Sequence, residues 1–290
     1  FKAGTEGWLS DILPKPIGSS SPLLASHPLT LPASIKVEEF ARACGGQMLL
    51  LSANMLGQVP LLLSANPGLI KRRLVPGVRA NLRGDPYLFA YAITEPHAGS
   101  DVEDGHGAQF SKPGVVAKHV PGGWLLNGRK VFISGGDLAR GYCVFAALEG
   151  EGFDSWSCCF VERGTTGFHP VRTELKMGMR ASGAAELEFV DVFVPDADVV
   201  GKVRGGWALN RQTLNLSRIP VGAMAVGFAQ AACDIAIDYA RTTQFGGRAL
   251  IHEQSVQLAL ADMMTHTSAA RAHVWAAACT WRVRQHSAAM

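Results

Sequence analysis

Hydroxyl-bearing and small residues gather at the end of one apolar stretch, residues 91–101. The stretch YAITEPHAGSD begins as a strand and ends in Thr94, a proline and Gly99-Ser100-Asp101. A strand end followed by a Pro-Gly loop presents a hydroxyl and backbone N–H groups at one edge of a sheet. Such an edge suits a ligand with ring carbonyls, ring nitrogens or phosphates. The same residues are good turn formers, so the residues alone leave a ligand site and an ordinary turn both open.

A second group of chemistry-bearing residues follows in the polar stretch DVEDGHG. Four of its side chains are of kinds that bind metal ions: Asp101, Glu103, Asp104 and His106. Their spacing defines no ligand geometry, and the chain has neither an H-E-x-x-H zinc motif nor a G-x-S-x-G nucleophile turn. We interpret the stretch as a polar loop beside the strand end and predict no metal site.

Composition and charge are those of an ordinary globular protein. The chain has 290 residues, 48% of them apolar, and 27 basic against 24 acidic side chains give a net charge of +3. So small an excess does not predict binding to nucleic acid or to an anionic membrane. Six cysteines occur without a C-x-x-C pair, which favours a reducing, intracellular compartment. The sequence does not choose between mitochondrion, peroxisome and bacterial cytoplasm.

The two ends of the chain carry no start or stop signal. The chain begins at Phe1, and its last residues still have a helical pattern. We therefore expect a piece of a longer chain, cut at both ends. No uninterrupted apolar run reaches the ~18 residues that cross a bilayer, so no membrane span is predicted.

Three blocks of secondary structure must position the strand end. Helical spacing of apolar residues, clearest over 35–83, predicts an N-terminal helical domain over residues 1–86. A period near two predicts a β domain over 87–202, either a barrel or a sandwich. Residues 203–290 are predicted to form a helical bundle, so the fold class is α+β with several domains.

Seven strands are expected in the middle domain, separated by turns rich in Gly and Pro. Their predicted ranges are 88–93, 114–119, 124–133, 142–148, 158–162, 168–171 and 185–194. Asn127-Gly128 between apolar flanks is a strong hairpin signal. A loop is predicted over 242–249, between two helical stretches.

Four stretches, in order, resemble the acyl-CoA dehydrogenase family over about residues 35–290. T-E-P-x-A-G-S-D at the strand end is similar to the family's flavin-contacting signature. NGRKVFISGG (127–136) and KMGMRASGAAELEFVDVFVPDADVVG (176–201) resemble its next two motifs. Residues 218–263 resemble the helices of its third domain. One such motif alone is weak evidence for membership of the family. Four motifs in the same order, on a helix–β–helix layout, are a specific match.

The resemblance implies a fold and an activity. The fold is a helical domain, a middle antiparallel β-barrel and a C-terminal helical bundle, with FAD bound between them and across a subunit interface. The activity is α,β-dehydrogenation of an acyl-CoA thioester, in which a carboxylate removes the α-proton and the β-hydride passes to flavin N5. The implied partners are acyl-CoA, electron-transfer flavoprotein or a similar acceptor, and further copies of the chain in a homodimer or homotetramer.

The resemblance also implies which residues contact FAD. Residues at the strand end match the family's strand beside the flavin pyrimidine and a serine shared with the pantetheine arm: Tyr91, Ile93, Thr94 and Ser100. Residues of the second motif match the segment along the isoalloxazine, where a ring can stack and a hydroxyl can reach N5: Phe132, Ile133 and Ser134. Gln254 matches a residue that reaches the flavin of the neighbouring subunit.

Substrate contacts and one flavin contact are implied on the helices. Ser100 again, Asn215 and Arg218 match positions that contact the acyl-CoA. The family's arginine for the flavin pyrophosphate is Thr243 here, and we expect Arg241, or else Arg248, to replace it, because a phosphate accepts donors from several directions. Solvated charges at a helix end are the alternative for both arginines.

No catalytic base is identified. Most family members carry it as a Glu that would lie beyond Met290, and a minority carry it beside the arginine matched by Arg218, where this chain has Ser217. A serine does not act as a base unaided. The catalytic residue is therefore unknown, and a Glu beyond Met290 is expected. The alternatives are a catalytically silent relative that binds flavin or acyl-CoA, and an oxidase on the same fold.

Overall fold

The computed structural model describes residues 2–10, 13, 18, 30–102 and 111–287, with side chains up to residue 280. The chain divides into two compact units. The first unit combines residues 1–20 with 49–215 and contains the large sheet, and the second combines 21–48 with 216–290 and is helical. The three predicted domains stay a prediction.

The predicted helical stretch 35–83 is confirmed, and its long helix α2 (Thr30–Leu63) starts earlier than expected. Its backbone leaves helical geometry at Cys44 (φ −159°, ψ 102°), which produces a kink. The remaining helices of this region are α1 (Lys2–Thr5), α3 (Pro67–Leu69), the π-helical η2 (Ile70–Leu74) and α4 (Val75–Leu82).

Helix α2 lies in direct contact with the first strand. A side-chain carbon at Gly57 would lie 2.6 Å from the carbonyl carbon of Phe89, so glycine is required for this approach. The side-chain oxygen of Asn54 accepts a hydrogen bond from the Phe89 amide (2.9 Å). One face of the strand that leads to Thr94 is therefore fixed by a helix.

All seven strands occur within two residues of their predicted ends. They are β1 (Phe89–Ala92), β2 (Val115–Val120), β3 (Gly123–Ser134), β4 (Gly141–Leu148), β5 (Ser157–Glu162), β6 (Phe168–Thr173) and β7 (Ala184–Pro195). β1 and β4 are buried along their whole length, which is why their sequences are continuous apolar runs. Short 3-10 turns accompany the strands: η3 (Ser100–Val102), η4 (Phe153–Ser155) and η5 (Asp196–Asp198).

The sheet is mixed, so the prediction of an all-antiparallel sheet is wrong. The strand order is β1-β4-β2-β3-β7-β6, with β5 also paired to β4. β1 and β2 both run parallel to β4, whereas the other pairs are antiparallel. Among the described residues the strand pairing does not close into a barrel. The local alternation of apolar and polar residues indicates which segments form strands. Whether two strands run parallel or antiparallel depends on pairing between segments far apart in the sequence.

The predicted hairpin at Asn127-Gly128 is also wrong. Both residues lie inside β3, where the register with β7 shifts between Leu126 and Gly128. Gly128 (φ +128°) approaches β2 so closely that a side-chain carbon would lie 1.9 Å from the Gly114 carbonyl oxygen. Asn127 exchanges two hydrogen bonds with Asp191 on β7. The extra residue of this irregularity lies on β7, where Asp191 has φ +49°, opposite Asn127. Gly128 is required on β3 by its close approach to Gly114, not by a turn.

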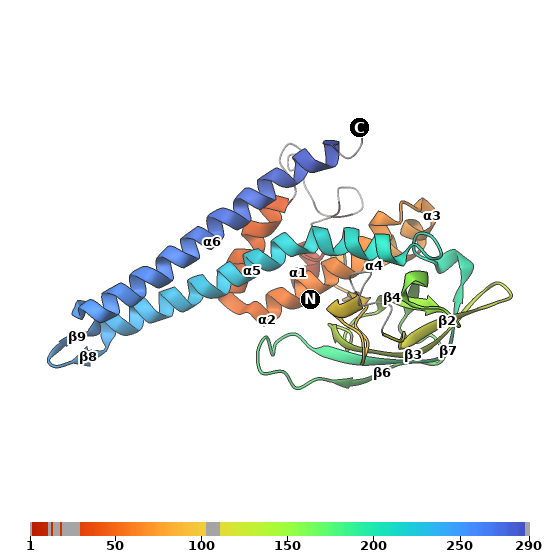
Figure 1. Ribbon diagram of the computed structural model, residues 1–290, viewed down its shortest axis with the longest axis horizontal. Coiled ribbons are helices and arrows are strands. Elements are labelled where there is room, and N and C mark those ends of the chain that lie inside the picture. Colours follow the sequence, from red (N-terminus) through yellow and green to blue (C-terminus); the bar gives the residue numbers. More distant parts are fainter. Residues whose placement is uncertain (1, 11–12, 14–17, 19–29, 103–110, 288–290) are drawn as a thin grey trace. The chain divides into compact units, whose positions relative to one another are not determined.

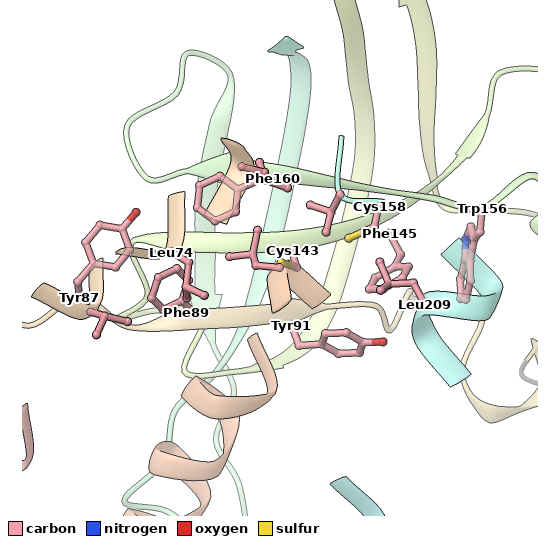
Figure 2. Close-up of a cluster of buried hydrophobic side chains, with 14 of the residues drawn as sticks. Leu74, Tyr87, Phe89, Tyr91, Cys143, Phe145, Trp156, Cys158, Phe160 and Leu209 are labelled. Carbon is pink, nitrogen blue, oxygen red and sulfur yellow. The ribbon is translucent and has the colours of Figure 1, made fainter. Parts of the chain in front are cut away.

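A cluster of buried hydrophobic side chains, with aromatic rings among its largest members, forms the core of the first unit and is called the aromatic cluster below (Figure 2). Tyr91 of β1 meets Phe145 of β4 edge-on, with ring centroids 5.1 Å apart. The ring centroid of Trp156 lies 5.3 Å from that of Trp207, and Trp207 belongs to the first turn of α5 (Gly206–Thr242). Burying each such side chain contributes roughly 1.5–3 kcal/mol, so the cluster fixes β1 firmly against β4.

The predicted loop 242–249 contains a small hairpin. Its strands are β8 (Gln244–Phe245) and β9 (Arg248–Ala249), and the 3-10 turn η6 (Leu250–His252) leads into α6 (Gln254–Ser287). The hairpin joins the end of α5 to the start of α6 (Figure 1).

The second unit is held together by a polar cluster between helices. Arg271 of α6 donates to Glu38 Oε1 of α2 (2.5 Å) and to Gln230 Oε1 of α5 (2.7 Å). Trp275 Nε1 donates to the other Glu38 oxygen (3.2 Å). A side-chain carbon at Gly227 would lie 2.3 Å from the Glu38 carbonyl oxygen, so α5 and α2 meet backbone to backbone.

Helices α2 and α5 are long and apolar enough to cross a membrane, by length and composition only. The most apolar window of α2 is 56% buried inside the protein, and that of α5 is 28% buried. Core helices of globular proteins have the same length and composition, so the two helices are weak evidence for a span. The absence of a membrane span stays a prediction.

Candidate functional site

The end of β1 lies beside the middle of β3. Ile93 and Thr94, which follow β1, are half-buried. The carbonyl oxygen of Thr94 accepts a hydrogen bond from the Val131 amide (3.0 Å). The first two motifs of the sequence therefore meet directly. We refer to residues 93–94 and 132–134 as the β1–β3 edge.

Strand β3 has a one-residue bulge at Phe132. The register with β7 shifts between Lys130 and Ile133, which leaves one extra residue on β3. Phe132 has φ +59°, a left-handed conformation that costs a residue with a side chain roughly 1–2 kcal/mol. Phe132 is 62% exposed, whereas Ile133 is buried. Bulges re-aim side chains next to binding sites, and strain of this kind persists only where the surroundings enforce it.

Ser134 ends β3 immediately after the bulge. It pairs with Ala184 of β7 and is half-buried. The chain then turns at Gly135 (φ +67°), whose amide donates to the Gly183 carbonyl oxygen (2.9 Å). Two partly buried hydroxyl residues, Thr94 and Ser134, thus belong to the same edge as the exposed ring.

Tyr142 holds the turn that follows Ser134. Its hydroxyl lies 2.8 Å from the Gly136 carbonyl oxygen and 2.7 Å from that of Ala139, and it donates its one hydrogen to this pair of acceptors. The side chain is fully buried, and this burial raises the pKa of Tyr142 to about 12. The phenol therefore stays neutral at physiological pH and keeps its role as donor.

A buried ion pair joins the two halves of the edge. Lys130 Nζ lies 2.7 Å from Glu95 Oε1, with side chains 0% and 1% exposed. Burial lowers the pKa of Lys130, while the attraction of Glu95 opposes that shift. Neither residue was predicted to belong to the site. The signal was present, since an acid and a lysine each stand inside a motif that resembles a flavin-contacting segment.

Tyr91 uses its side chain in the core rather than at the edge. The hydroxyl donates to Asn210 Oδ1 (2.6 Å), and the ring packs in the aromatic cluster (Figure 2). Only its backbone is thus suited to a ligand contact. The predicted flavin contact of Tyr91 stays a prediction.

Ser100 is exposed at the start of η3, next to an ordered carboxylate. Asp101 accepts hydrogen bonds from the Gly99 amide (2.7 Å) and the Ser111 hydroxyl (3.0 Å), and these bonds lower its pKa. The other residues weighed as metal ligands lie outside the described residues: Glu103, Asp104 and His106. Over the described ranges no group of three metal-ligating side chains occurs.

The predicted residues on the helices are solvent-exposed: Asn215, Arg218, Arg241 and Gln254. Arg248, the alternative to Arg241, lies 2.7 Å from Glu253 and forms an ion pair with it. Ser217 beside Arg218 is half-buried. The contacts predicted for these residues stay predictions. Of all predicted site residues, the structure brings together those of the β1–β3 edge.

Family models match two long segments of the chain. Residues 90–192 match the middle domain of acyl-CoA dehydrogenases, and residues 204–289 match their C-terminal domain. The acyl-CoA dehydrogenase of Bacillus subtilis is 33% identical over 279 residues, which cover 96% of this chain and 69% of that relative. Other curated relatives are covered over 60% to 65% of their length, so the chain spans about two thirds of such proteins.

Solved structures show the same fold. Butyryl-CoA dehydrogenase from Megasphaera elsdenii superposes with a TM-score of 0.84 at 31% identity, over 96% of this chain and 70% of that one. An acyl-CoA dehydrogenase from Bacillus anthracis, complexed with FAD, gives a TM-score of 0.80 at 28% identity. That match covers 94% of this chain and 44% of the other.

Proposed function

This chain belongs to the acyl-CoA dehydrogenase family, and from that premise we propose that the protein containing it binds FAD at the β1–β3 edge. We further propose that it oxidises an acyl-CoA thioester between the α and β carbons. The family match and the geometry of the edge both support this function. Since the chain spans about two thirds of its relatives, the proposal concerns the whole protein.

The observation that carries the proposal is the ring of Phe132. Phe132 as a residue is 62% exposed and its backbone is held at φ +59°, so burial of the side chain in the core does not explain this conformation. A planar aromatic ring in solvent is suited to stacking on another planar ring system. Strained backbone conformations cluster at active sites and ligand contacts, so the strain at Phe132 supports a ligand contact here.

The edge fits the ring system of FAD in its chemistry. The hydroxyls of Thr94 and Ser134 can each donate or accept a hydrogen bond, which matches ring nitrogens and carbonyl oxygens. Phe132 offers the stacking surface, and the backbone of Ile93 and Ile133 completes the edge. When bound, FAD supplies the acceptor for the two electrons that leave the substrate.

Ser100, Asn215 and Arg218 are proposed to contact the acyl-CoA. All three are exposed, and their amide, hydroxyl and guanidinium groups suit the phosphates and amides of coenzyme A. Arg241 and Gln254 are proposed to contact FAD. Electron-transfer flavoprotein or a similar acceptor, and assembly as a homodimer or homotetramer, rest on the family resemblance.

A catalytically silent relative that still binds FAD or acyl-CoA is the second candidate. Two residues favour it. Ser217 stands where a minority of the family would carry the base, and Thr243 stands where the family's motif has an arginine. A hydroxyl is no base without a partner, so no residue of this chain is assigned the proton transfer.

Anaerobic addition of a saturated acyl-CoA to the purified full-length protein separates these functions. We expect bound flavin whose visible absorption bleaches on addition and returns slowly when air is admitted. A fast return would identify an oxidase, and bound flavin that never bleaches would identify the silent relative. A full-length protein that neither contains flavin nor takes up FAD would contradict the proposal.

A further inference from the structure

We propose that Lys130 and Glu95 are positioning residues that set how the two strands of the β1–β3 edge face a bound flavin ring; this inference rests on the proposed FAD binding. Both side chains are essentially inaccessible to solvent, so neither touches a ligand at the edge. Their effect is exerted through the backbone of the residues that do.

The ammonium group of Lys130 contacts both neighbours of Thr94. Nζ donates to the Ile93 carbonyl oxygen (2.8 Å) on one side and to Glu95 Oε1 (2.7 Å) on the other. Thr94 itself accepts from the Val131 amide (3.0 Å), and Val131 is the residue after Lys130. One lysine and its neighbour thus fix three consecutive residues of the strand end against β3.

Glu95 extends this connection to β2. Its carboxylate accepts hydrogen bonds from the Gly114 amide (2.6 Å) and the Val115 amide (3.2 Å). A side-chain carbon at Gly114 would lie 3.3 Å from Glu95 Oε2, so the carboxylate is closely enclosed. The carboxylate of Glu95 therefore connects the segment after β1 to the start of β2.

An apolar pair would fill the same space without specifying the same geometry. Two buried charges are tolerated only when their hydrogen-bonding groups are satisfied, and that requirement allows few arrangements. The ammonium finds two oxygen acceptors and the face of Trp156, whose ring centroid is 5.7 Å away. The hydrogen bonds of Lys130 to Ile93 and Glu95 are directional, so they define the distance between Thr94 and the bulge at Phe132.

The bulge at Phe132 explains why the geometry of the β1–β3 edge must be held in place. Phe132, two residues after Lys130, keeps φ +59° only if its surroundings enforce that conformation. Lys130 is the last residue before the register shift, and its side chain is fixed at three points. Loss of the pair would let the bulge relax and would move the ring of Phe132 relative to Thr94.

The test uses the full-length protein with Lys130→Met, and with the double substitution Lys130→Met/Glu95→Gln. The double variant removes both charges and keeps an acceptor oxygen for the β2 amides, so it serves if the single variant does not fold. We expect the dissociation constant for FAD to rise at least tenfold. We also expect a shifted visible absorption maximum of bound FAD and faster hydrogen exchange at the Val131 amide in FAD-free protein.

Arg73→Met is the matched control within the same unit. Arg73 forms a partly buried pair with Asp198 and also donates to Glu162 (2.9 Å), away from the β1–β3 edge. We expect this variant to keep the FAD affinity, the absorption maximum and the Val131 exchange rate of the unsubstituted protein. If Arg73→Met weakens FAD binding as much as the Lys130 variants do, the effect is one of general stability and the inference is wrong.

The two proposals fail in different ways. If the unsubstituted protein binds no FAD, the proposed function is wrong, and Val131 exchange still decides the role of the pair. Faster exchange in the Lys130 variants but not in Arg73→Met supports positioning. Unchanged exchange, or unchanged FAD affinity and spectrum in a protein that binds FAD, overturns it.

Discussion

The sheet-containing unit and the helical unit each contain a buried ion pair, and the two pairs connect different kinds of structure. Lys130 and Glu95, 0% and 1% exposed, join strand ends around a strained residue. Arg271 and Glu38, 23% and 5% exposed, join three helices whose backbone bonds are already internal. Strand ends and bulges leave backbone N–H and C=O groups without partners in the strand pairing, and these groups need hydrogen bonds from elsewhere. Lys130 and Glu95 bond to such groups, and theirs is the more deeply buried of the two pairs.

Breaking the pair in the sheet unit should have the largest effect on stability. Lys130→Met leaves Glu95 buried without its cation, and removal of one partner of a buried pair typically costs about 3–5 kcal/mol. The free energy of unfolding, measured by urea denaturation, checks this value. A loss under about 1 kcal/mol would show that the pair is not energetically coupled to the fold.

Breaking the pair in the helical unit should cost less. Arg271→Met leaves Glu38 with the hydrogen bond from Trp275 (3.2 Å) and with access for water through the partly exposed arginine position. We expect a loss of about 1–2 kcal/mol in the same denaturation experiment. A loss larger than that of Lys130→Met would reverse the comparison between the two units.

Tyr142→Phe should cost about 1 kcal/mol at neutral pH, because two carbonyls lose their buried donor. The pKa of Tyr142 is raised from 10.0 to about 12, so the folded protein holds this proton more tightly than the unfolded chain. The stability it contributes is complete below pH 10.0 and is lost as the pH rises through 12. We expect unfolding free energies of the variant to depend less on pH in that window; equal slopes would contradict this role.

Phe132→Gly should have the smallest effect on stability. Glycine adopts positive φ freely, so the gain from relieved strain offsets the lost contacts of a mostly exposed ring. We expect the free energy of unfolding to change by less than about 0.5 kcal/mol, as for other surface positions. A loss of several kcal/mol would mean that the ring stabilises the fold and is not reserved for a ligand.

The strand ranges could be predicted from the sequence, because alternation and turn residues are local signals. The parallel pairing of β1 with β4 could not, since it depends on residues far apart in the chain. Asn127-Gly128 carried a correct signal for unusual backbone geometry, but the cause is the close approach of Gly128 to Gly114 opposite a bulge on β7, and not a turn.

The site shows the same division. Thr94, Phe132 and Ser134 were predicted as flavin contacts from motifs, and the structure places the end of β1 against β3 through the hydrogen bond from the Val131 amide to the Thr94 carbonyl oxygen. The strained backbone of Phe132, and the buried pair of Lys130 and Glu95 next to it, could not be predicted. Lys130 and Glu95 each stand inside a motif that resembles a flavin-contacting segment, but they are 35 positions apart, and no local pattern shows that their charges meet in the interior.

The most direct test of the central claim compares two exposed phenylalanines of the same sheet. Phe132 is 62% exposed at the bulge, and Phe193 of β7 is 44% exposed without belonging to the β1–β3 edge. Each is replaced by alanine in the full-length protein, and the dissociation constant for FAD is measured by titration of the FAD-free form. We expect Phe132→Ala to weaken binding about tenfold or more, since stacking on an aromatic side chain contributes roughly 1–3 kcal/mol, and Phe193→Ala to leave it unchanged. Equal affinities for the two variants would contradict the claim that this edge holds the flavin.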